Sequence, residues 1–402
     1  MTILALLFFI SFSLLAWRKF NLALGFFIIF LPAYLIRPTI FGLPTTILEI
    51  AFGALFLVWI IKYFKTDKDV IVGFLKEHKF FTTCFIIFFL ASTSGIFISD
   101  MWWYSLGQWR AYFLEPMILF LIILGRRDEI RETDLVTPLT VSSLSVSLLA
   151  IWQKVMGSGF PPSLWDDFLD GRVVSFFTTP NAIGLYLAPI LFLPIILMKD
   201  RNQKWLAVAA MPLAVTAILF SRSIGAWLAL AVGVLAFVWL MGFKKLVVGA
   251  VLLVLIIPVM FPFVSKVFGG KSGANRLMLW SYSQEFLTAS PKNFVFGAGI
   301  RQFFRKVQKP HYDAEELERL IYPHNIFLNF WTEIGLAGML SFVGLFGFGL
   351  YAAAKKIKQN RILGSVLVVA LLVFFVHGLV DVPYFKNDLA FLFWIIFSLA
   401  AI

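Results

Sequence analysis

The chain has 402 residues, of which 60% are hydrophobic and 14% are charged, and its mean hydropathy is +0.90. Soluble domains are only about 45–50% apolar, so this composition excludes a water-soluble globular fold and predicts a polytopic membrane protein. The formal charge of +12 falls in short clusters between apolar stretches. We therefore assign this charge to membrane topology and expect the lipid bilayer, and no nucleic acid, as a partner.

The apolar stretches are long enough to cross a bilayer as helices, which takes about 17 to 25 residues each. They do not alternate between apolar and polar residues as barrel strands do, so the predicted fold is all-α. We expect a single membrane domain over residues 1–402, built as a transmembrane bundle of 12 or 13 helices. The predicted spans are 3–17, 20–36, 45–61, 80–98, 107–125, 136–153, 181–198, 205–221, 224–242, 246–263, 327–354, 362–380 and 389–402. The first two are short, and one broken hairpin is an alternative for them.

Lys and Arg residues in alternate loops predict the orientation, because basic residues are retained on the cytoplasmic side. One set of loops holds 19 of them and the other set holds 6, so the first set is cytoplasmic. The remaining nine lie in residues 264–323, which we predict to be a long extracytoplasmic loop inserted within the membrane domain. Helical patterns at 276–287 and 314–321 interrupt this loop, and loops of this length are usually functional.

Two acidic features precede the long loop. Glu115 is a carboxylate within an apolar span, so it is either functional or paired with Arg110. Asp166, Asp167 and Asp170 have no histidine near them in the sequence, and aspartates alone in a loop are usually solvated. We therefore predict no metal site.

Arg222 interrupts a stretch that is otherwise without charge from Trp205 to Phe243, about twice the length of one span. It therefore marks the outer turn between two helices. An arginine at such a turn either snorkels to the interface or binds an anion. Arg276 and Arg301 lie in the loop on the same face, and convergent guanidinium groups beside a histidine describe a pocket for phosphate oxygens.

The segment Pro323-His324-Asn325 follows the long loop directly, and Gly335 and Gly338 come 11 and 14 residues after the histidine. In a helix that begins at His324, these offsets bring both glycines to within about 40° of the histidine's face, where they would allow close helix packing. His324 has a polar neighbour at the outer edge of a span, so it is a candidate base near neutral pH. A helix anchor at the interface is the alternative.

Asp381 follows His377 at the outer end of a late span. Asp381 could orient a base or bind an acceptor. The alternative is an ordinary polar residue at a helix end.

These residues resemble the motifs of the O-antigen ligase and polymerase family. The histidine pattern is His324-Asn325-x9-Gly335-x2-Gly338, and the arginine turn is Ser221-Arg222-Ser223-x-Gly225-x-Trp227. The loop signature is Asn275-Arg276-x3-Trp280, followed by Phe296-Gly297-x-Gly299. A further similar segment is Arg172-Val173-Val174-Ser175-Phe176-Phe177. The ligase-like region covers residues 172–340, and the residues before it are similar only in being hydrophobic spans.

The resemblance implies a metal-independent, inverting glycosyltransferase with no cofactor, in a bacterial inner (plasma) membrane with its active face on the periplasmic side. It would move a glycan from undecaprenyl diphosphate to an acceptor hydroxyl, on lipid A core or on a related glycolipid or glycan. His324 would accept the hydroxyl proton, and Arg222 and Arg276 would bind the diphosphate. Supporting roles are implied for Arg172, Arg301, Asn325 and Asp381.

A ligase-like activity is favoured, and a polymerase of the same family is the alternative. A lipid-linked glycan transporter or flippase would also have about twelve spans, but it would be expected to show repeated halves. A non-catalytic scaffold is a further alternative.

Overall fold

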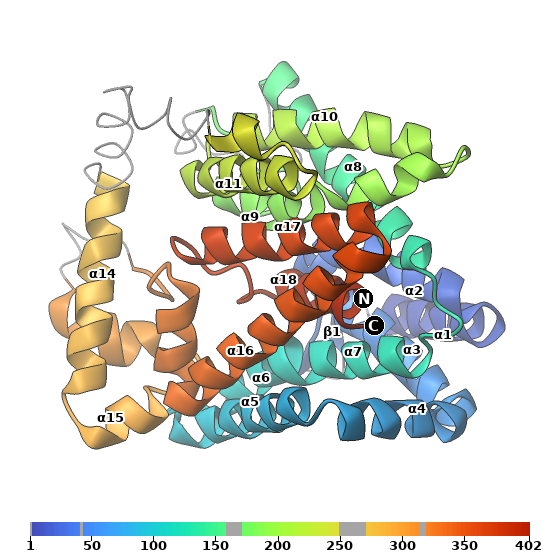
Figure 1. The fold of residues 1–402 in the computed structure, drawn as a ribbon. Helices are drawn as coiled ribbons and strands as arrows, with labels where there is room; N and C mark the ends of the chain where they lie inside the picture. Colours follow the sequence, from blue (N-terminus) through green and yellow to red (C-terminus); the bar gives the residue numbers. More distant parts are fainter. Residues whose placement is uncertain (1, 41–42, 158–170, 249–270, 313–318) are drawn as a thin grey trace.

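The computed structural model describes residues 2–40, 43–157, 171–248, 271–312 and 319–402 (Figure 1). The predicted span 246–263 lies almost entirely outside these residues, as do Asp166, Asp167 and Asp170. Helices dominate the described residues, and the predicted all-α fold is confirmed. The exception is one minimal hairpin, in which β1 (Thr39–Ile40) pairs antiparallel with β2 (Leu43–Pro44).

Every other predicted span falls on one helix or on consecutive helical segments. The first half of the chain forms α1 (Thr2–Arg18), α2 (Phe20–Ile29), η1 (Leu31–Leu35), α3 (Ile47–Lys62), α4 (Phe64–Glu77), α5 (Lys79–Ile98), α6 (Trp102–Trp109), η2 (Arg110–Leu114), α7 (Glu115–Gly125), α8 (Glu132–Met156), α9 (Pro180–Ile190) and η5 (Leu193–Lys199). The second half forms α10 (Lys204–Ser221), α11 (Ile224–Leu240), α14 (Lys271–Thr288), α15 (Pro291–Phe296), η6 (Phe303–Gln308), η7 (Lys309–His311), α16 (Ile326–Gln359), α17 (Arg361–Gly378) and α18 (Asn387–Ala401).

The number of spans that length alone supports is smaller than predicted. Among the described residues, seven helices are long and apolar enough to cross a membrane, or eight if the bent pair α3 and α4 is one span. The apolar helices α1, α2, α11 and α18 have only 10 to 17 residues. The number of spans therefore approaches the predicted count only if these shorter helices also cross the membrane. The predicted span 20–36 shows the reason, because its α-helix ends at Ile29 and a 3₁₀ turn that includes Pro32 follows.

The last helix, α18, is the core of the bundle. Nearly every side chain from Asn387 to Ala400 is buried, on all sides of the helix. Such a helix needs neighbours all round, and α7, α16 and α17 pack against it. In turn α16 packs along α5 and α17, and α17 packs against α11, whereas α14 and α15 stand at one edge of the bundle (Figure 1).

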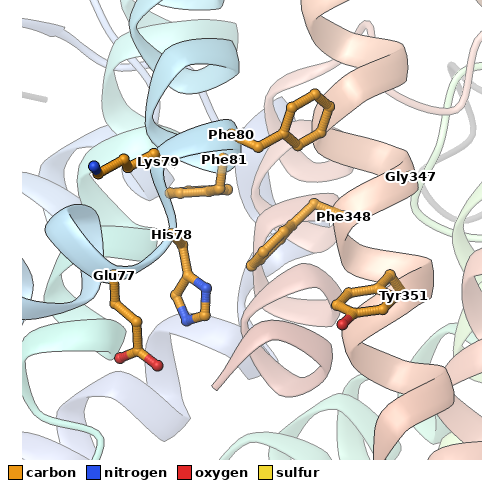
Figure 2. Close-up of a pocket in the computed structure, with 8 residues that line it drawn as sticks. All are labelled: Glu77, His78, Lys79, Phe80, Phe81, Gly347, Phe348 and Tyr351. Atoms are coloured by element: carbon orange, nitrogen blue, oxygen red, sulfur yellow. The ribbon is translucent and has the colours of Figure 1, made fainter.

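A cavity of ≈ 480 Å³ lies between the junction of α4 with α5 and the second half of α16 (Figure 2). Its walls are largely aromatic, and the His78 ring lies 4.4 Å from that of Phe74 and 5.3 Å from that of Phe348. The helices α3 and α4 meet before it at an angle of 95°. No predicted site residue lines this cavity. The predicted base, His324, lies at the other end of α16.

Candidate functional site

His324 lies in the turn just before α16, and its backbone is in the left-handed region with φ 53°. The helix begins only at Ile326, because the Asn325 side chain caps it by accepting hydrogen bonds from the backbone N–H groups of Phe327 and Leu328 at 3.0 and 3.1 Å. The Asn325 amide also donates to the Leu379 carbonyl at 3.1 Å. Asn325 therefore joins the start of α16 to the loop between α17 and α18.

The prediction that His324 shares a helical face with Gly335 and Gly338 is wrong. His324 is not helical, and α16 breaks at Gly335, whose φ is 78° and ψ 176°. A Cβ atom on Gly335 would clash with the Val295 carbonyl oxygen, and one on Gly338 would meet Ile334 of its own helix. Gly335 therefore allows α16 to turn against the end of α15, and the predicted close packing does not involve the histidine.

Asp381 is the partner of the histidine. The His324 Nδ1 atom lies 3.0 Å from Asp381 Oδ1, and the two side chains are 18% and 5% exposed. Burial alone would raise the pKa of Asp381, but the charge of His324 and the hydrogen bond to it outweigh burial, so this pKa lies below its usual range. An ionised carboxylate only accepts hydrogen bonds, so Nδ1 carries the hydrogen and Nε2 is the basic nitrogen of the neutral ring.

The helix α14 holds both sides of this pair through backbone carbonyls. Arg276 Nε donates to the Val380 carbonyl at 2.9 Å, and Trp280 Nε1 donates to the Pro323 carbonyl at 2.9 Å. Val380 and Pro323 directly precede Asp381 and His324 in the sequence. One turn of α14 therefore attaches to both segments, with Trp280 on the residue before His324 and the Arg276 guanidinium on the residue before Asp381.

Arg222 forms the turn between α10 and α11, again with a left-handed backbone, φ 52°, and an exposed side chain. Three residues later, Gly225 lies so close to the loop after α17 that a Cβ atom there would be 3.0 Å from Val380 and 3.1 Å from the His377 ring. The backbone beside Arg222 therefore meets the same residue, Val380, that Arg276 contacts.

Arg172 holds the turn that contains Arg222 by hydrogen bonding to its backbone. Its Nε donates to the Ser221 carbonyl at 2.8 Å, and its Nη2 donates to the Asn181 side chain at 2.8 Å. Arg172 thus contacts the backbone of the turn one residue before Arg222.

Left-handed backbone is concentrated in the predicted motifs. In the part of the chain that the structure describes, the non-glycine residues with positive φ are Ser175, Arg222, Arg301 and His324. Such conformations cost about 1–3 kcal/mol each and persist where the surrounding structure imposes them, often at functional sites. All four lie in or next to segments that the sequence analysis identified, which gives a second and independent reason to look there for function.

We expected Arg301 to lie beside His324, but it contacts other residues. Its guanidinium lies over the Tyr104 ring, 5.4 Å from the centroid, and its backbone N–H is hydrogen-bonded to the Glu333 carboxylate. Gln108 also donates to Glu333, at 3.3 Å. The residue therefore belongs to a separate polar group near the break in α16.

Glu115, the other carboxylate considered, is paired. Arg110 lies between it and Glu49, with N–O distances of 3.4 Å to Glu115 and 2.9 Å to Glu49. Within the described ranges, no group of three or more His, Cys, Asp or Glu side chains could hold a metal ion.

Comparison with known families identifies the region that carries these residues. Residues 209–343 match the family described as O-Antigen ligase. The match includes Arg222, Arg276 and His324, whereas Arg172 and Asp381 lie outside it. No curated protein matches the chain.

Proposed function

We propose that this chain, a multi-pass membrane protein of the O-antigen ligase family, transfers a glycan from undecaprenyl diphosphate to an acceptor hydroxyl at the outer face of a bacterial inner membrane. The observation that carries the proposal is the bond between His324 and the buried Asp381, next to Val380, where the segments that bear Arg222 and Arg276 meet. A base with an oriented imidazole and two cationic side chains is the equipment that such a transfer needs.

In the proposed reaction, the acceptor oxygen attacks the anomeric carbon of the glycan while the bond from that carbon to the diphosphate oxygen breaks. The hydroxyl proton passes to Nε2 of His324, because Nδ1 is engaged with Asp381. Attack from the side opposite the leaving group inverts the anomeric centre. Asp381 stabilises the positive charge that the imidazole gains and holds the ring in one orientation.

Arg222 and Arg276 would bind the diphosphate as it leaves. A guanidinium offers forked donors that match pairs of phosphate oxygens, and its charge offsets the charge that grows on the leaving group. The Nε atom of Arg276 already donates to the Val380 carbonyl, and this hydrogen bond holds the guanidinium group next to the Asp381 loop. The two arginines would perform the neutralising role that a divalent cation has in other transferases.

The direct test is reconstitution of the purified full chain with an undecaprenyl diphosphate glycan and an acceptor glycolipid, in the presence of a chelator and without nucleotide. We expect a glycosylated acceptor and released undecaprenyl diphosphate in equal amounts. A transporter or a scaffold would leave the donor intact. Loss of transfer on chelation, with recovery on adding metal, would contradict the proposed role of the arginines.

The same assay separates the ligase from the polymerase. Transfer to lipid A core is the result expected for a ligase, whereas transfer to a second lipid-linked repeat is the polymerase result.

A further inference from the structure

An exposed aromatic surface adjoins the group around Arg301. Trp102, Trp103 and Tyr104 begin α6, and their side chains are 58%, 57% and 57% exposed. The two tryptophan rings stand nearly perpendicular, at 78°, with centroids 5.2 Å apart, and the Arg301 guanidinium covers the Tyr104 ring. Three consecutive large aromatic side chains thus form a surface with an arginine along one side.

The base of this surface is polar and rigid. Glu333 is 3% exposed and is held by the Gln108 amide and the Arg301 backbone. Ser105, which is fully buried, donates to the Ile300 carbonyl at 2.9 Å, so the start of α6 is fixed to the residue before the strained backbone of Arg301. The aromatic rings therefore stand in a defined relation to the arginine.

The surface is connected to the proposed site by α16. Residues 326–334 run from the His324 turn to the break at Gly335, a distance of about 13 Å at 1.5 Å per residue. The rest of α16, up to its lysines at 355 and 356, has about the 20 residues that a full crossing needs. The first nine residues are thus not needed to span the membrane, and they lead from the histidine to Glu333.

We infer that Trp102, Trp103, Tyr104 and Arg301 form a binding subsite for a saccharide chain of the substrates. The C–H groups on the face of a pyranose ring pack against the negative face of an aromatic ring. Arg301 supplies donors and Gln108 a carbonyl oxygen for hydroxyl groups. The inference rests on the proposed function and specifies how a glycan extending from His324 is held.

The test compares substrates of different glycan length with the purified full chain in vesicles. For Trp103→Ala and Tyr104→Ala, we expect KM to rise about 2- to 10-fold for a donor or an acceptor that carries several repeats, with no change for one that carries a single sugar. Varying donor length and acceptor length separately assigns the subsite to one of the two. Tyr104→Phe keeps the ring and should restore the wild-type KM.

Trp152→Ala is the matched control, because Trp152 is 53% exposed at the predicted outer end of α8, away from the surface. Equal changes for short and long glycans, or no change, would overturn the inference and leave the aromatic residues as membrane anchors. If the alanine variants insert poorly, Arg301→Gln provides the same length comparison. Absence of any transfer by the wild-type chain would instead refute the proposed function.

Discussion

Two histidines, His78 and His324, lie near opposite ends of α16, and their surroundings differ. His78 lies in the ≈ 480 Å³ cavity, with its ring packed beside Phe74 and Phe348. His324 is bonded to a buried carboxylate in a strained turn beside two arginine-bearing segments. A cavity alone therefore does not identify the residue that carries the chemistry. Polar partners around a titratable group, and the backbone strain that holds it, are the better guide.

The largest expected effect separates the two histidines directly. His324→Ala should lower the rate of glycan transfer by at least about 100-fold, because the hydroxyl proton loses its acceptor. His78→Ala should leave the rate within about 2-fold of wild type, since aromatic packing on an accessible cavity tolerates a small change. Transfer is measured in vesicles and normalised to inserted protein. Near-normal transfer by His324→Ala would remove this histidine from the mechanism.

Arg222→Ala should reduce transfer by about 100-fold, because one preorganised donor to the leaving diphosphate is lost. Arg222→Lys should fall between this variant and wild type, since an ammonium keeps the charge but not the fork. Arg18→Ala, which removes an exposed arginine at the end of α1, serves as the control for charge alone. Equal rates for Arg222→Lys and Arg222→Ala would argue against a purely electrostatic role.

Asp381→Asn should lower transfer by at least about 10-fold, the lower end of the loss that replacing the hydrogen-bond partner of a functional imidazole causes. The oxygen of the asparagine amide can still accept from Nδ1–H, but its NH2 group can also donate to Nδ1, and a ring with its hydrogen on Nε2 cannot act as the base. Asp128→Asn changes an exposed carboxylate, 83% accessible, and should have no effect. If Asp381→Asn matches wild type in rate, the carboxylate is a packing residue and the alternative of a helix-end polar group stands.

The smallest effect on activity, and a clear one on stability, is expected for Gly335→Ala. The new Cβ would clash with the Val295 carbonyl, and the alanine would have to adopt a φ of 78°. Together these two effects should lower the free energy of unfolding by about 1–3 kcal/mol. Gly347→Ala is the control in the same helix, where a Cβ meets nothing within 4 Å. Thermal unfolding in detergent measures both variants. Equal midpoints would mean that the break at Gly335 is not required.

Much of the fold was predictable because a bilayer leaves few choices for apolar sequence. The helical pattern from Arg276 to Leu287 became α14. The start of α16 was misjudged although Asn325, a favourable N-cap before Ile326, was visible in the sequence. The apolar stretch 20–36 also overestimated its α-helix, which ends at Ile29 before a 3₁₀ turn that contains Pro32.

The partners within the candidate site were harder to predict than its members. His324 and Asp381 are 57 residues apart in the sequence, and Glu333 meets the backbone of Arg301, 32 residues earlier, just before the break in α16. Hydropathy and motif spacing describe each segment singly. They hold no information on which side chain of a distant loop a given turn will reach.

The hydrogen bonds from Trp280 and Arg276 of α14 to the site end on main-chain oxygen atoms, those of Pro323 and Val380. Every amino acid has such an oxygen, so these two attachments do not depend on the side chains at 323 and 380. A chain with different residues at those two places could keep Trp280 and Arg276 bound where they are. Sequence variation there would then tune the shape around the histidine without releasing the helix that holds it.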